Sequence, residues 1–160
     1  MIPSTDERLA SVVRALTDVV MPSLPAEAGL AREQVELSLG HLQILRAQFD
    51  TIASYEAEEL ADARALGEAL SGCAGGPKTG SAAAILTNTV AKVTGTEGPA
   101  EIRTARITIH AEIAALVKAV AADGDAATRS RMSRLILAHE TRRVAKDRAW
   151  FAPFGFDSGD

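Results

Sequence analysis

The sequence predicts an all-α protein, an up-and-down helical bundle of about five helices with one overlong helix. Three observations lead to this class. Residues 28–70 contain no proline and carry apolar side chains at a helical rhythm. Hydrophobic residues make up 47% of the chain although aromatic residues make up only 4%, and no segment alternates apolar and polar residues as a half-buried strand would. A core of Ala, Leu, Ile and Val lets helices approach closely, which favours a bundle over a sheet.

The first predicted helix covers about residues 6–20. Ser4, Thr5 and Asp6 are side chains that cap helix N-termini, and an apolar stripe follows them at helical spacing. Pro22 and Pro25 come next, and because proline interrupts the hydrogen bonding of a helix, we expect them to end it in a short stiff turn.

The overlong helix is predicted over about residues 28–70. At about 1.5 Å per residue it would span roughly 60 Å, more than a compact domain of this size accommodates, since the radius of gyration should be about 15 Å. It therefore bends, near Gly40 or Ser54, or it overhangs and pairs with a second copy, and we favour the overhang. Its apolar stripe consists of Leu30, Leu37, Leu42, Leu45, Phe49, Ile52, Tyr55 and Leu66.

The remaining chain divides at glycine-rich and proline-containing segments. We expect a Gly-rich interhelical loop at 71–80, a break at 95–99 and a tight turn at 123–125. Three further helices then lie at about 81–93, 100–122 and 126–150, followed by an aromatic C-terminal tail at 151–160. With 160 residues, the chain is predicted to form a single helical-bundle domain over 1–160.

The charge is unevenly distributed along the chain. The formal net charge is −4, but residues 1–100 carry 7 basic and 13 acidic side chains, whereas residues 126–150 carry 7 basic and 2 acidic ones. We interpret this as a basic last helix lying beside an acidic long helix, with ion pairs between them. A patch for an anion or a protein partner is the alternative. The acidic remainder argues against a nucleic-acid partner.

The expected cellular location follows from the charged residues near the N-terminus and from the shortness of the apolar runs. Asp6, Glu7 and Arg8 break up any N-terminal signal pattern, and no apolar run approaches the roughly 20 residues that a membrane span needs. Cys73 is the single cysteine, so no internal disulfide framework forms. We expect a cytoplasmic protein with no membrane partner.

The candidate ligand-binding residues are three histidines and one arginine. His41, His110 and His139 fall on three different predicted helices and could converge in the bundle. The apolar stripe of the last helix continues into His139 and Arg143, and a charge drawn into a core must be paired. Four glutamates of the long helix are the expected partners of these two residues: Glu33, Glu36, Glu56 and Glu59.

Two interpretations of His139 and Arg143 stay open: they form a structural ion pair that fixes the helix register, or they bind a small anionic ligand in a polar pocket. Each of the three histidines is either part of such a site or a partly buried residue whose polar groups a neighbour satisfies. We predict no metal and no cofactor, because Arg143 stands where a second zinc-ligating histidine would follow His139-Glu140, and no Glu-x-x-His pair occurs. We also predict no catalytic residue, since no Ser or Cys nucleophile stands in a recognisable setting.

The segment 72–79 resembles a phosphate-binding loop. Pro77 replaces its second glycine and offers no backbone N–H, and the preceding segment is a predicted helix rather than a strand. We therefore interpret it as an interhelical linker. A weaker anion site at the N-terminus of the next helix, formed by Lys78, Thr79 and Ser81, stays open.

Four of the six aromatic residues lie at the end of the last predicted helix and in the C-terminal tail: Trp150, Phe151, Phe154 and Phe156. They either plug the open end of an alanine-rich bundle or anchor a partner chain. Taken together, the sequence favours a non-enzymatic protein acting through helix-mediated association, as a homodimer or an accessory subunit. The alternative is a bundle that binds a small ligand or a metal around His139 and Arg143, including an enzymatic one.

Overall fold

A computed structural model describes residues 2–93 and 98–154. All regular structure in these residues is helical, so the predicted all-α class is confirmed. The chain divides into two compact units, Met1–Ile52 and Ala53–Asp160.

The N-terminal unit is a helical hairpin. Its first arm is α1 (Thr5–Ala15), continued by a π-helical turn η1 (Leu16–Val20) and by α2 (Met21–Ser23), and its second arm is α3 (Gly29–Gln48). Ser4 caps α1, accepting a hydrogen bond from the Glu7 N–H while the Glu7 side chain accepts one from the Ser4 N–H. The two arms are joined by an ion pair between Asp6 and Arg46, with 2.8 Å between Oδ1 and Nε.

The first arm runs one turn further than the sequence predicted. Pro22 does not end it: the helix passes through Pro22 and ends at Ser23. The π-helical turn before Pro22 shifts the hydrogen-bond register there, so that the Met21 N–H bonds to the carbonyl oxygen of Leu16. The carbonyl groups of Met21 and Leu24 at the end of the arm accept hydrogen bonds from Arg32, at 3.4 Å and 3.2 Å.

The predicted single helix over 28–70 is wrong, because two helices of 20 residues occupy this segment. α3 ends at Gln48 and α4 (Ile52–Ser71) begins after a turn at 49–51. The amide and the hydroxyl of Thr51 both donate to the Gln48 carbonyl, at 2.9 and 3.0 Å. Side chains such as Thr that bond to nearby backbone compete with helical hydrogen bonding, and the break therefore falls here rather than at Gly40 or Ser54.

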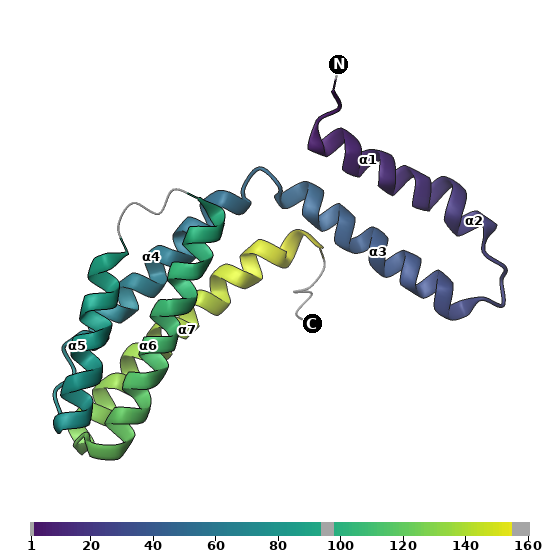
Figure 1. The fold of residues 1–160 in the computed structure, drawn as a ribbon. Helices are drawn as coiled ribbons and strands as arrows, with labels where there is room; N and C mark the ends of the chain where they lie inside the picture. The colour runs from purple at the N-terminus through teal and green to yellow at the C-terminus, as the bar shows by residue number, and fades with distance from the viewer. Residues whose placement is uncertain (1, 94–97, 155–160) are drawn as a thin grey trace. The chain divides into compact units, whose positions relative to one another are not determined.

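The second unit is an up-and-down four-helix bundle. α4, α5 (Pro77–Lys92), α6 (Pro99–Asp123) and α7 (Ala126–Phe151) run in alternating directions, as Figure 1 shows, and a short 3₁₀ turn η2 (Ala152–Phe154) follows. Their apolar stripes meet in one core. Its largest fully buried side chains are Leu70, Leu86, Ile109, Leu116, Val120 and Thr79.

α5 begins four residues before the predicted start, so the loop expected at 71–80 is shorter. Its first two amides donate to the carboxylate of Asp123, from Lys78 at 2.7 Å and from Thr79 at 3.0 Å, and the Thr79 hydroxyl adds a bond of 2.6 Å. A Cβ on Gly76 would lie 2.6 Å from the same carboxylate, so a larger residue there would displace Asp123 from this position. Asp123 thus occupies the N-terminus of α5, and the anion site left open for Lys78, Thr79 and Ser81 is filled by the chain's own carboxylate.

Candidate functional site

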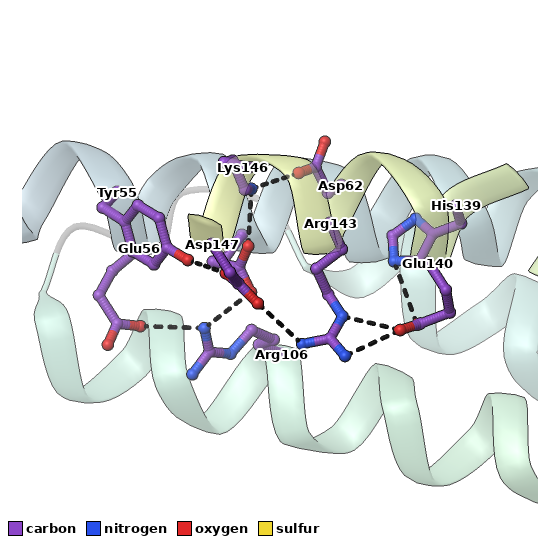
Figure 2. Close-up of polar contacts among 10 residues, drawn as sticks. Tyr55, Glu56, Asp62, Arg106, His139, Glu140, Arg143, Lys146 and Asp147 are labelled. Carbon is purple, nitrogen blue, oxygen red and sulfur yellow. Dashed lines mark hydrogen bonds and ion pairs between the residues drawn. The ribbon is translucent and has the colours of Figure 1, made fainter. Parts of the chain in front are cut away.

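The side chains that lie between the helices of the four-helix bundle change from apolar to polar along its length. On α4, Ala63, Leu66 and Leu70 are buried, and the same helical spacing continues backwards to Glu59 and Glu56. On α6 and α7 the polar positions again lie at this end of the bundle. We name these residues the polar cluster: Tyr55, Glu56, Glu59, Asp62, Arg106, His110, His139, Glu140, Arg143, Lys146 and Asp147. Figure 2 labels all of them except Glu59 and His110.

Glu59 is the centre of the polar cluster. Its side chain is 12% exposed, and Lys146 Nζ from α7 lies 2.6 Å from Oε1 while Arg106 Nη1 from α6 lies 3.4 Å from Oε2. Glu59 therefore links three helices. Arg106 also approaches Glu56 Oε2 at 3.5 Å, and Lys146 reaches Asp62 Oδ2 at 2.5 Å at the more exposed edge.

Tyr55 and Trp150 close one side of the cluster. Their rings are stacked, with 4.2 Å between centroids and 28° between planes, and Lys146 Nζ lies 5.4 Å from the centroid of Tyr55. The Tyr55 hydroxyl donates to Asp147 Oδ1. Burial, with the negative charge of Asp147 beside it, raises the pKa of the Tyr55 phenol well above its ordinary value.

Arg143 is paired within its own helix. Its Nη2 lies 2.8 Å from Glu140 Oε2, and its Nη1 lies 3.4 Å from Asp147 Oδ2. These contacts span three and four residues of α7, the spacing at which helix side chains are neighbours. The hydrogen bond to Glu140 is the main reason that the pKa of Arg143 lies above its ordinary value.

Two histidines complete the cluster. The His139 side chain is 6% exposed, and its Nε2 lies 4.0 Å from Glu140 Oε1. His110 is an exposed residue of α6, and partial desolvation, with the nearby His139 and Arg106, lowers the pKa of its imidazole. His110 and His139 therefore interact electrostatically across α6 and α7.

This geometry brings together three of the four predicted ligand-binding residues. His110, His139 and Arg143 lie in the polar cluster, whereas His41 belongs to the N-terminal hairpin. In the described residues, no group of three or more His, Cys, Asp or Glu side chains is placed to hold a metal ion.

Glutamates of α4 do form ion pairs across the bundle, but their partners are not the predicted His139 and Arg143. Ion pairs do connect the acidic α4 to the basic α7, through Lys146. Glu56 pairs with Arg106, and Glu59 pairs with both Arg106 and Lys146. Arg143 instead pairs with two residues of its own helix, α7. The other two expected partners, Glu33 and Glu36, belong to the N-terminal hairpin.

Arg106 and Asp147 were not singled out from the sequence, although one signal marks Arg106. It lies four residues after Ile102 and three before Ile109, so it interrupts an apolar stripe. A charge in that position must find a partner across the bundle. No comparable pattern marks Asp147, whose partner Tyr55 lies 92 residues away in sequence.

The polar cluster is a network of ion pairs among side chains of the chain itself. Arg106, Arg143 and Lys146 each have two carboxylate partners within the chain. An anionic ligand would have to compete with carboxylates that are already in place, so the geometry favours a structural role that fixes the helix register.

The predicted aromatic interface divides in a similar way. Trp150 is half-buried on Tyr55, so it serves the bundle itself, while Phe151 is 39% exposed at the end of α7 and Phe154 is half-buried in η2. Phe156 lies outside the described residues. The role of these aromatic residues in an interface stays a prediction.

Comparisons of the chain with protein-family models, with curated proteins and with solved structures found no match. Among the described residues, no helix combines the length and the apolar character needed to cross a membrane. The function is therefore argued from the residues and their packing.

Proposed function

We propose that this protein is non-enzymatic and acts through helix-mediated self-association, with the N-terminal hairpin as the associating element. The observation that carries the proposal is the contrast in burial between the two units. In residues 2–52 the one buried side chain is Gln48, whereas the bundle has a continuous apolar core. A two-helix layer needs a further layer to cover its apolar side.

The hairpin exposes large apolar side chains on both arms. On the first arm, Val12 and Val19 are 47% and 62% exposed, and on α3 the values are 74% for Leu30 and 51% for Leu37. Apolar groups gathered on one element mark an interaction surface, whereas scattered ones do not. A second hairpin would complete a four-helix arrangement, the same solution that the other half of the chain uses.

Light scattering of the full chain across a concentration series tests the proposal. We expect a dimer at concentrations above about 10 µM that dissociates on dilution. The matched variants are Leu37→Gln in the hairpin and Ile107→Gln in the bundle, both at exposed apolar positions. Weaker association of the Leu37 variant alone supports the hairpin as the associating element, and a monomer at every concentration rejects self-association. The cytoplasmic location expected from the sequence belongs to this proposal, and the free, buried Cys73 is consistent with it.

A further inference from the structure

His139 is a buried titratable side chain at the polar end of the bundle. Its imidazole Nε2 lies 4.0 Å from Glu140 Oε1, and among the described residues Glu140 is the one acidic residue in ion-pair contact with this imidazole. A histidine side chain ordinarily changes its charge between about pH 5 and about pH 8, and a buried positive charge must be paired. Protonation of His139 therefore acts on Glu140 first.

Glu140 is already bound by Arg143. Its Oε2 lies 2.8 Å from Arg143 Nη2 and accepts a hydrogen bond of 2.9 Å from Nε. Figure 2 shows this carboxylate between the guanidinium of Arg143 and the imidazole of His139. A neutral imidazole leaves Glu140 to Arg143, whereas a charged imidazole competes for the same carboxylate.

Arg143 connects Glu140 to the aromatic side of the polar cluster. Its Nη1 lies 3.4 Å from Asp147 Oδ2, and Asp147 Oδ1 accepts the hydroxyl hydrogen bond of Tyr55 from α4. Tyr55 in turn stacks on Trp150, with 4.2 Å between ring centroids. We name this succession of neighbours the contact series: His139, Glu140, Arg143, Asp147, Tyr55 and Trp150.

The charged groups of α6 at this end are cations. His110 interacts electrostatically with His139, and Arg106 acts on His110 from the same helix. These cations oppose a further positive charge on His139, so Glu140 is the group that has to compensate it.

The charged groups of the other two helices are paired or distant in sequence. Glu56 and Glu59 of α4 form ion pairs with Arg106 and Lys146. α5 carries no charged residue between Lys78 and Lys92. A protonated His139 therefore draws on Glu140 rather than on a carboxylate of α4.

From these contacts we infer that the polar end of the bundle is a pH-sensitive switch, in which protonation of His139 draws Glu140 away from Arg143 and thereby alters the stacking of Tyr55 on Trp150. Arg143, with less of Glu140, turns to Asp147 and competes there with the hydroxyl of Tyr55. The inference goes beyond the proposed self-association and does not depend on it, because every residue of the contact series belongs to the bundle.

Trp150 reports on the switch, because it is the single tryptophan of the chain. In the full chain we expect its fluorescence to change in one step between about pH 8 and about pH 5. His139→Gln should abolish this step. Circular dichroism confirms that each variant is folded, and light scattering at both pH values separates the step from any change in association.

Glu140→Gln tests whether the effect travels through the contact series. The Glu140 side chain is 41% exposed, so this variant should fold. NMR of the imidazole C–H groups should show that His139 still titrates in it, whereas the fluorescence step of Trp150 should be lost. Glu68→Gln is the matched control, because Glu68 is exposed near the other end of α4, and it should keep the step.

Three outcomes would overturn the inference. Fluorescence that stays constant between about pH 8 and about pH 5 would show that no switch operates. A step that survives Glu140→Gln would show that His139 does not act through Glu140. A step that His110→Gln removes and His139→Gln leaves would place the titrating group on α6. None of these outcomes bears on self-association, which the concentration series tests separately.

Discussion

Lys146 Nζ lies 2.6 Å from Glu59 Oε1, and this contact ties the last helix of the bundle to the first. Both side chains are largely buried, with 23% and 12% exposed. Breaking one partner of such a pair leaves a charge with poor access to water, which costs more than an exposed pair contributes.

Glu59→Gln should therefore destabilise the bundle substantially. Because Arg106 and Lys146 both lose a charged partner, we expect the free energy of unfolding to fall by about 2–4 kcal/mol. Glu58→Gln is the matched control, since Glu58 is exposed on the same helix, and it should change stability by less than about 0.5 kcal/mol. Urea unfolding followed by circular dichroism measures both, and equal effects would show that Glu59 is not the centre of the network.

Tyr55 provides a spectroscopic measurement, because it is the single tyrosine of the chain. Burial and the neighbouring Asp147 raise the pKa of its phenol, so phenolate absorbance should appear only at a pH well above that of free tyrosine. The neutral phenol is favoured in the folded state. Its contribution to stability is therefore complete below the ordinary tyrosine pKa and is lost as the pH rises through the raised value.

Two substitutions separate the causes of this shift. Asp147→Asn removes the negative charge and should bring the titration of Tyr55 closer to that of free tyrosine. Tyr55→Phe keeps the stacking on Trp150 and removes the hydroxyl bond, which should cost about 1 kcal/mol of unfolding free energy. A titration unchanged by Asp147→Asn would mean that burial alone sets the pKa.

His110 predicts how the bundle responds to mild acid. Partial desolvation and the nearby His139 and Arg106 lower its pKa, so the folded state favours the neutral imidazole. Its contribution to stability is present above the ordinary histidine pKa, near 6.5, and is lost as the pH falls through the lowered value. Unfolding free energies measured by chemical denaturation at pH 7.5 and at pH 5 should fall less for His110→Gln than for the parent chain.

The stability of α5 should depend on the ionised carboxylate of Asp123. Hydrogen bonds from the Thr79 hydroxyl and from the first amides of α5 lower its pKa. The stabilisation is therefore complete above the ordinary carboxyl range and is lost as the pH falls through the lowered value. Asp123→Asn should lower the Tm at neutral pH and flatten its decline in acid. Asp18→Asn, at an exposed site in the hairpin, is the control, and equal Tm values for the two variants would contradict the capping role.

Features that a single residue marks directly were predicted well, whereas a helix start set by a distant residue and a turn without a clear marker were missed. The last two helices were placed to within one residue, because Pro99 and Asp125 mark their starts directly. The start of α5 was missed because Asp123, the residue that caps it, lies 44 residues from Thr79. The break at 49–51 was missed because the apolar spacing continues across it, although Thr51 closes a turn there by bonding to the Gln48 carbonyl.

The candidate site shows the same limit. The apolar stripe of α7 runs into His139, which is buried, and Arg143, which is 40% exposed, and both lie at the polar end of the bundle. Which carboxylate pairs with which cation depends on how each helix is rotated about its own axis, and the sequence pattern does not determine that rotation. Arg143 accordingly pairs with Glu140 and Asp147 on its own helix, and Lys146 is the residue of α7 that pairs with α4.

The change from an apolar to a polar seam implies that a single helix has two different stabilities along its length. Close-packed leucines around Leu70 and Leu116 open only when the whole bundle unfolds, whereas ion pairs reachable by water separate in smaller fluctuations. Backbone amides in the second half of α4 should therefore exchange with deuterium far more slowly than those near Glu56. The bundle would then fray from its charged end, with added salt widening the opening and leaving the leucine end closed.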